Sequence, residues 1–195
     1  ILVKDGRALE ALTDIDTVLF DKTGTLTADQ LRVTEVIATG GWDPARVLAV
    51  AAAAEGRVTH PLARALAAAA ARELDCPPLP ADNLDFRIGF GVTADIDGER
   101  VLVGGRRHLD TAGIDLGAAA RGALAAAEAQ GATALLVATT AGVQGVISLG
   151  TRPRPEAAGI VHFLADHGIA QIALVSGDAG EPTRSLARDL GIEHA

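Results

Sequence analysis

The sequence predicts an α/β fold in which a doubly wound, Rossmann-type domain is interrupted by a second, α+β domain with an antiparallel sheet. Two short apolar strands near the ends of the chain predict the first domain, because each runs into a polar loop. A long segment with a different order of strands and helices separates them. We therefore expect one domain from residues 1–30 and 145–195, and an inserted domain at residues 31–144.

The outer domain is predicted from two strands and two helices. The stretch "DTVLFD" at 16–21 is short, apolar and β-branched, as buried strands are, and "IALV" at 172–175 has the same character. Pro155 opens a helix predicted at 154–168, and a further helix is predicted at 181–191. This alternation of strand and helix indicates a sheet covered by helices.

The inserted domain begins with two helices that share a start signal. Asp43 caps the helix predicted at 43–54, in which Pro44 takes the first position. Pro61 opens the helix predicted at 59–74 in the same way. These two helices are rich in alanine, which suits close packing on a sheet.

Strands make up most of the remaining inserted segment. Residues 85–105 have the pattern of strands with a tight turn at 97–98. Residues 132–150 have the pattern of two strands joined near 141–142, and a helix is predicted at 117–131. The segment is therefore expected to form a meander with its own helices.

Composition excludes several classes of protein. The net charge of −8 argues against a nucleic-acid-binding surface, because such surfaces are basic. The single cysteine, Cys76, rules out an internal disulfide and favours a reducing compartment. No apolar run approaches the roughly 18 residues of a membrane span, and no signal peptide is visible. Four histidines lack metal-ligand spacing and are assigned to the surface or to helix ends: His108, His162, His167 and His194.

The stretch "DKTGTLT" at 21–27 carries the clearest chemistry. Asp21 follows the first strand, and a second polar run follows the other strand, so both are expected to face one crevice. The residues of that second run are Ser176, Gly177 and Asp178. A carboxylate there can attack phosphorus and form an aspartyl-phosphate, with Thr25 and Ser176 as donors to the phosphoryl oxygens. Asp21 and a nearby backbone carbonyl could bind Mg²⁺.

These seven residues closely resemble the phosphorylation motif of P-type ATPases, cation pumps of the haloacid-dehalogenase-like superfamily that form an aspartyl-phosphate. The resemblance implies that Asp21 is phosphorylated and that Thr25 holds phosphate oxygens. It also implies that the Thr23 carbonyl joins Asp21 in binding Mg²⁺, and it places Lys22 beside the site. The superfamily has a Rossmann-like core, and in the pumps the nucleotide-binding domain is inserted after this motif.

A second group of residues resembles the nucleotide site of the heavy-metal pumps in this family. The stretch "HPLARAL", which begins at His60, looks like their His-Pro motif, and Glu55 precedes it where the family has a glutamate. Gly89 and Gly91 match their glycine pair. The resemblance implies that His60 stacks on or bonds to adenine and that Glu55 recognises its amino group. The glycines would let the backbone approach ATP.

Several positions depart from the family pattern. Ser176 replaces the threonine of its Thr-Gly-Asp motif and keeps the hydroxyl. Gly105 stands where an asparagine is usual, Thr151 where a hinge aspartate is usual, and Thr59 where an acidic residue precedes His-Pro. These changes bear on ATP affinity and on the hinge. The family's later lysine and its Gly-Asp-Gly-x-Asn-Asp motif, with a further Mg²⁺ ligand, would follow residue 195, so we expect no pump-like ATP turnover by this chain alone.

The leading interpretation is the ATP-binding and aspartyl-phosphorylation portion of a heavy-metal-transporting P-type ATPase that uses ATP and Mg²⁺. The parent protein is expected to be embedded in the plasma membrane, with this portion on the cytoplasmic face. The transported cation would bind in membrane helices outside the chain, so the sequence does not name the ion.

Two alternatives stay open at this stage. One is a soluble phosphatase of the same superfamily, and the other is a non-catalytic, nucleotide-binding regulatory module. Phosphatases of the superfamily usually carry a second aspartate two residues after the nucleophile as acid and base, whereas this chain has Thr23. That threonine favours a covalent intermediate that persists, as a pump requires.

Overall fold

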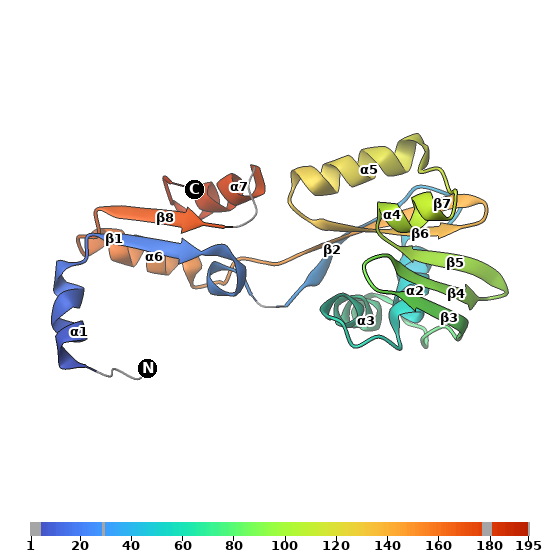
Figure 1. Cartoon of the computed structure of the whole chain (residues 1–195), viewed down its shortest axis with the longest axis horizontal. Helices are drawn as coiled ribbons and strands as arrows, with labels where there is room; N and C mark the ends of the chain where they lie inside the picture. Colours follow the sequence, from blue (N-terminus) through green and yellow to red (C-terminus); the bar gives the residue numbers. More distant parts are fainter. Residues whose placement is uncertain (1–4, 29, 177–180, 195) are drawn as a thin grey trace. The chain divides into compact units, whose positions relative to one another are not determined.

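The computed structural model describes residues 5–28, 30–176 and 181–194 (Figure 1). The chain divides into two compact units. Unit 1 consists of Ile1–Asp29 and Arg152–Ala195, and unit 2, inserted into it, consists of Gln30–Thr151. The sequence analysis placed the second boundary at 144–145. In the structure it lies at 151–152, because strand β7 (Gly142–Gly150) pairs along its whole length with strands of unit 2.

Unit 1 is built on two parallel strands. Strand β1 (Thr17–Asp21) pairs with β8 (Gln171–Val175), and Asp21 lies opposite Val175 at the end of the register. The α-helices in the described part of this unit are α1 (Gly6–Ala11), α6 (Ala157–Asp166) and α7 (Glu181–Leu190). Buried apolar side chains from β8, α6, α7 and the turn after β1 form one core, against which Phe20 of β1 packs: Leu26, Ala157, Val161, Leu174, Ala187, Leu190 and Ile192. The predicted α/β character of the outer domain is confirmed.

Unit 2 is an antiparallel sheet with the strand order β2-β7-β6-β5-β4-β3 (Figure 1). Its other strands are β2 (Arg32–Ala38), β3 (Ala81–Arg87), β4 (Gly91–Ile96), β5 (Glu99–Gly104) and β6 (Thr133–Thr139). Its helices are α2 (Pro44–Glu55), α3 (Pro61–Glu73), α4 (Arg106–Thr111) and α5 (Gly117–Ala129). The predicted insertion of an α+β unit with an antiparallel sheet is confirmed.

Helices cover both faces of this sheet, and β6 shows why. Leu135 and Val137 belong to the core under α2 and α3, whereas Leu136 and Ala138 belong to a second core under α4 and α5. Successive side chains of a strand point to opposite faces, so an apolar run is buried on both sides. None of the helices in the described ranges has both the length and the apolar character that crossing a bilayer requires.

The predicted starts of α2 and α3 are confirmed, whereas α6 begins at Ala157, two residues after the predicted Pro155. The Asp43 carboxylate accepts a hydrogen bond from the Arg46 amide at 2.8 Å, which satisfies one of the free N–H groups of the first turn of α2. At the start of α3, His60 Nδ1 accepts from the Leu62 amide at 3.3 Å. His60 is therefore held in place by the helix that it caps.

Candidate phosphorylation and nucleotide sites

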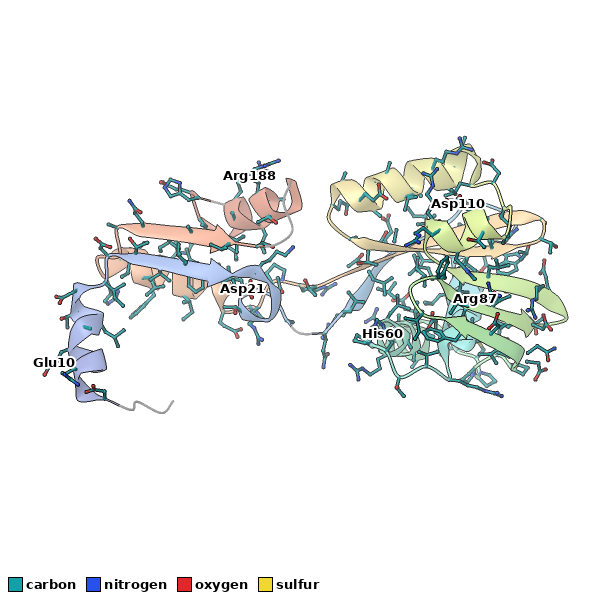
Figure 2. The ribbon with its side chains drawn as sticks, viewed as in Figure 1. Glu10, Asp21, His60, Arg87, Asp110 and Arg188 are labelled. Carbon is teal, nitrogen blue, oxygen red and sulfur yellow. The ribbon has the colours of Figure 1, made fainter. Side chains whose placement is uncertain are left out.

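The first candidate site lies at the carboxyl end of β1. Asp21 is the last residue of this strand and is exposed (Figure 2). Because Asp21 is opposite Val175 in the parallel register, the half-buried Ser176 follows at the same edge of the sheet. The strands thus bring a carboxylate and a hydroxyl residue to one edge, as predicted. Gly177 and Asp178 lie outside the described residues.

The loop after Asp21 is a single wide helical turn, Lys22–Leu26. The Thr27 amide and the Thr27 hydroxyl both donate to the Lys22 carbonyl at 3.1 Å and close this turn. Gly24 has a φ of 80°, which residues other than glycine rarely adopt. This backbone conformation explains why the motif has a glycine at this position. Leu26 and Thr27 are buried and anchor the turn, whereas Thr25 is exposed.

Sequence reasoning missed a contact that this turn makes with the chain returning from unit 2. The Arg154 guanidinium donates from Nε to the Thr25 carbonyl and from Nη2 to the Gly24 carbonyl, both at 3.0 Å. Arg154 lies three residues after Thr151, the position where the family has its hinge aspartate, and this was the one signal in the sequence. Its contact with the turn spans 129 and 130 residues, which no local pattern reveals.

The second candidate site lies in unit 2, where α2 ends and α3 begins. Glu55 closes α2 with only 5% of its surface exposed. Its carboxylate has no hydrogen-bond or ion-pair partner in the part of the chain that the structure describes, and its oxygens keep some contact with solvent. Burial raises the pKa of the Glu55 carboxyl, because the charged form loses hydration there. A buried carboxylate of this kind is a candidate for ligand recognition.

This buried carboxylate has a testable consequence for stability. A raised pKa in the folded state means that Glu55 stabilises unit 2 below the ordinary pKa of a glutamate, and that this contribution is lost as the pH rises through the folded pKa. Trp42, the single tryptophan, lies in unit 2, so its fluorescence during urea unfolding can be followed between about pH 4 and 7. In Glu55→Gln, the free energy of unfolding of unit 2 should change less between these two pH values than it does in the unmutated chain. An unchanged pH profile would contradict the shift.

The two glycines of the predicted pair play different parts. Gly89 has a φ of 78°, and a Cβ atom there would meet nothing within 4 Å, so the backbone is open to an approaching ligand. At Gly91, which starts β4, a Cβ atom would lie 2.2 Å from the Val103 carbonyl oxygen of β5. Gly91 is therefore required by the close contact of two strands, whatever it contributes to a ligand.

The position that departs from the family asparagine is not explained by packing. Gly105 has an ordinary φ of −77°, and a Cβ atom there would meet nothing within 4 Å. Its amide donates to the Phe90 carbonyl at 3.2 Å, which any residue other than proline could do. Nothing in the structure accounts for the glycine at this position.

Two arginines, Arg87 and Arg107, lie beside the turn that contains Gly89, and the sequence analysis did not predict either of them. The guanidinium carbon of Arg107 lies 5.2 Å from the centre of the Phe90 ring, within the range of a cation–π interaction. Arg87 lies on β3 just before the turn and pairs with Asp85 at 3.2 Å. In a chain with a net charge of −8, these guanidinium groups bring two positive charges to this turn, one of them paired with Asp85.

One histidine differs from the expectation of a surface or helix-end position. His108 lies in α4 with 6% of its surface exposed, and its Nε2 is 3.1 Å from the Thr93 hydroxyl oxygen. Burial lowers the pKa of His108, because the charged imidazolium would lose hydration. The histidine is thus a buried polar member of unit 2, and no group of three possible metal ligands occurs among the described residues.

Comparison with known proteins defines the class. Residues 15–195 match the family of haloacid dehalogenase-like hydrolases. The chain therefore belongs to the haloacid dehalogenase-like hydrolases.

Within this class the relatives are metal-transporting ATPases. The chain is 40% identical to the probable copper-exporting P-type ATPase V of Mycobacterium tuberculosis, over 99% of this chain and 25% of that protein. It is 34% identical to the zinc-exporting P-type ATPase of Mycobacterium marinum, over 99% of this chain and 26% of that protein. The crystal structure of a zinc-transporting PIB-type ATPase in the E2.Pi state superposes with a TM-score of 0.83 at 33% identity, over 100% of this chain and 31% of that one.

The resemblance to heavy-metal P-type ATPases that the motifs indicated is confirmed along the whole chain. The chain spans about a quarter of the length of these curated relatives. Proteins of this class generally use ATP and Mg²⁺.

Proposed function

We propose that this chain is the ATP-binding and aspartyl-phosphorylation portion of a heavy-metal-transporting P-type ATPase. The observation that carries the proposal is the position of Asp21, an exposed carboxylate at the carboxyl end of a parallel strand. The polar turn that follows is anchored by buried residues, and Ser176 follows the neighbouring strand at the same edge. This arrangement can offer a nucleophile and hydroxyl donors to one phosphoryl group.

In the proposed reaction a carboxylate oxygen of Asp21 attacks the γ-phosphorus of ATP. The new bond joins that oxygen to phosphorus, the bond from phosphorus to the β–γ bridging oxygen breaks, and ADP leaves with the electron pair. Water later attacks phosphorus, releases phosphate and restores the carboxylate. Thr23 stands where a phosphatase would have its acid and base, so hydrolysis is slow enough for the intermediate to persist.

The donor set at this strand end fits Mg²⁺. The Asp21 carboxylate and the Thr23 carbonyl belong to one strand end and the turn that follows it, and both offer the hard oxygen ligands that Mg²⁺ prefers. Bound there, Mg²⁺ would offset the negative charge of the phosphoryl group. Thr25, Ser176 and Lys22 would supply the donors on the protein side.

Unit 2 is proposed to hold the nucleotide. The buried Glu55 carboxylate can accept a hydrogen bond from the adenine amino group, and the exposed His60 ring can stack on the base. The open backbone at Gly89 lets a ligand approach, and Gly91 holds the turn in place. The guanidinium groups of Arg87 and Arg107 provide the positive charge that a triphosphate needs.

The nucleotide proposal predicts weaker ATP binding by two variants of this chain. Glu55→Gln and His60→Asn should each reduce the binding free energy by about 1–3 kcal/mol, because each removes one contact with the base. Asparagine can still cap α3, so His60→Asn separates the ring from its structural role. Titration calorimetry with ATP measures the effect, and Asp75→Asn, which changes an exposed carboxylate to an amide in the loop after α3, is the control. Unchanged affinity in both variants would remove these residues from the site.

The full-length protein is proposed to couple this chemistry to export of a metal ion across a membrane, with this chain on the cytoplasmic face. The relatives named for copper and for zinc each match 99% of this chain, so the comparison does not identify the transported ion. Neither the phosphatase nor the regulatory alternative is favoured by these relatives. The test is labelling of the full-length protein by γ-labelled ATP, where an acid-stable, hydroxylamine-sensitive phosphoenzyme is expected. Absence of such a phosphoenzyme would contradict the proposal.

A further inference from the structure

The segment that returns the chain from unit 2 runs along the end of the Asp21 turn. The Ala28 amide donates to the Arg152 carbonyl at 2.9 Å, and the Arg154 amide donates to the Leu26 carbonyl at 2.8 Å. Thr27 and Pro153 form an antiparallel bridge between these two bonds. The backbone of the turn is therefore held against a segment that is remote in sequence.

The Arg154 side chain extends this contact into the turn itself. Its Nε and Nη2 donate to two successive carbonyls, those of Thr25 and Gly24, at 3.0 Å each. A guanidinium presents its N–H groups in a rigid, planar fork, so the two bonds fix the orientation of both carbonyls together. The bonds are charge-assisted and stronger than those between neutral groups.

Fixing a carbonyl also fixes the N–H group of the same peptide plane, which points the opposite way. The Gly24 carbonyl shares its plane with the Thr25 amide, so Arg154 on one side of the turn sets the direction of that N–H on the other. Gly24 has a φ of 80° and brings little conformational restriction of its own. The turn between Asp21 and the buried Leu26 thus depends on an external group for its shape.

We propose that Arg154 is a positioning residue for phosphoryl transfer: it holds the turn after Asp21 in the one shape in which the turn's donors can meet the phosphoryl group. The inference rests on the proposed function, since it assigns a role in that reaction. Arg154 acts through the backbone of Gly24 and Thr25.

Two measurements test this role, and Arg152→Ala is the matched control. Arg152 is an exposed arginine two positions before Arg154. Among the described residues, its side chain makes no hydrogen bond or ion pair. The first measurement is amide hydrogen exchange of this chain. Arg154→Ala should speed exchange across residues 22–27 by about tenfold or more, with β1, β8 and unit 2 unchanged. Arg154→Lys, which offers a single ammonium group, should give an intermediate rate.

The second measurement is the rate of phosphoenzyme formation by the full-length protein from γ-labelled ATP. Arg154→Ala should lower the rate at saturating ATP by about 10- to 100-fold, because a small displacement of reacting groups has effects of this size. The ATP concentration for half-maximal rate should not change, and Arg154→Lys should recover part of the rate. If Arg154 only stabilised the fold, the rate at saturating ATP would not fall while the ATP concentration for half-maximal rate stayed constant.

The outcomes distinguish the inference from the proposed function. If Arg154→Ala exchanges residues 22–27 as slowly as the unmutated chain, or is phosphorylated as fast as the unmutated protein, the positioning role is wrong. The proposed function would still stand, as long as the unmutated full-length protein is labelled. A wild-type full-length protein that takes no label would instead overturn the proposed function, and the inference with it. Faster exchange throughout β1 and β8 in Arg154→Lys would show general destabilisation and would also count against the inference.

Discussion

Replacing Asp21 by asparagine is expected to abolish the covalent labelling of the full-length protein by γ-labelled ATP. An amide is not a competent nucleophile toward phosphorus, and the exposed carboxylate at the end of β1 is the group that the proposed reaction requires. The substitution keeps the size of the side chain, so the turn that follows should keep its shape. ATP binding should survive, because Glu55 and His60 belong to unit 2.

The control for this experiment is Asp14→Asn. Asp14 is another exposed aspartate, placed in the short turn before β1, and the change in charge is the same. Phosphoenzyme is measured after acid quenching, with hydroxylamine treatment to identify an acyl-phosphate. Label that remains on the Asp21→Asn protein, at the level of the Asp14→Asn control, would refute the assignment of the nucleophile.

Replacing Gly91 by alanine is expected to lower the free energy of unfolding of unit 2 by about 2–4 kcal/mol. The added Cβ would lie 2.2 Å from the Val103 carbonyl oxygen and 2.7 Å from the Gly104 Cα, both of them backbone atoms of the paired strand β5. Gly91 also has a φ of 145°, which is unfavourable for alanine. Relief would require β4 and β5 to separate. Urea unfolding followed by Trp42 fluorescence measures this loss.

Gly89→Ala is the matched comparison. Gly89 also has a positive φ, but a Cβ atom there meets nothing within 4 Å, so only the conformational cost of about 1 kcal/mol is expected. Equal losses in the two variants would show that the contact between β4 and β5 is not the source of the effect. If Gly89→Ala weakens ATP binding without a comparable loss of stability, the open turn is the part that approaches the ligand.

Much of the fold was predictable because its local signals agree. The proline and aspartate at the start of α2 predicted where it begins, and the Asp97-Gly98 pair adopts the two positive φ values, 53° and 77°, that a tight hairpin turn requires. Short helices without such signals were missed, among them α4, which has six residues and no side-chain cap.

The boundary between the units was harder to predict, for a reason that β7 shows. Along β7 nearly every residue is buried, because helices cover both faces of the sheet. A strand of this kind has no polar alternation and looks like a strand of a doubly wound sheet, which is also buried on both faces. The sequence analysis accordingly gave residues 145–150, the greater part of β7, to the outer domain. Only the pairing of β7 with β2 and β6 places it in unit 2.

The candidate sites were likewise predictable where they depend on local sequence and not where they depend on distant contacts. Asp21 could be placed at a strand end because the motif directly follows an apolar run. The burial of Glu55 was not visible in the sequence, since it depends on how α2 packs against α3 and the sheet. The contact of Arg154 with Gly24 and Thr25 was equally hidden, because the whole of unit 2 separates the partners in sequence.

The two stretches of chain that connect the units are neighbours at both of their ends. On the side of unit 1, the Ala28 amide bonds to the Arg152 carbonyl, and on the side of unit 2, Arg32 is paired with Gly150. Unit 2 therefore leaves and re-enters at a single point, where a short hairpin turn could close the gap after excision. A gene can gain, lose or exchange such a cassette without disturbing the pairing of β1 with β8. Under the proposed function, the unit that binds the nucleotide could therefore be exchanged without altering the strand that carries Asp21.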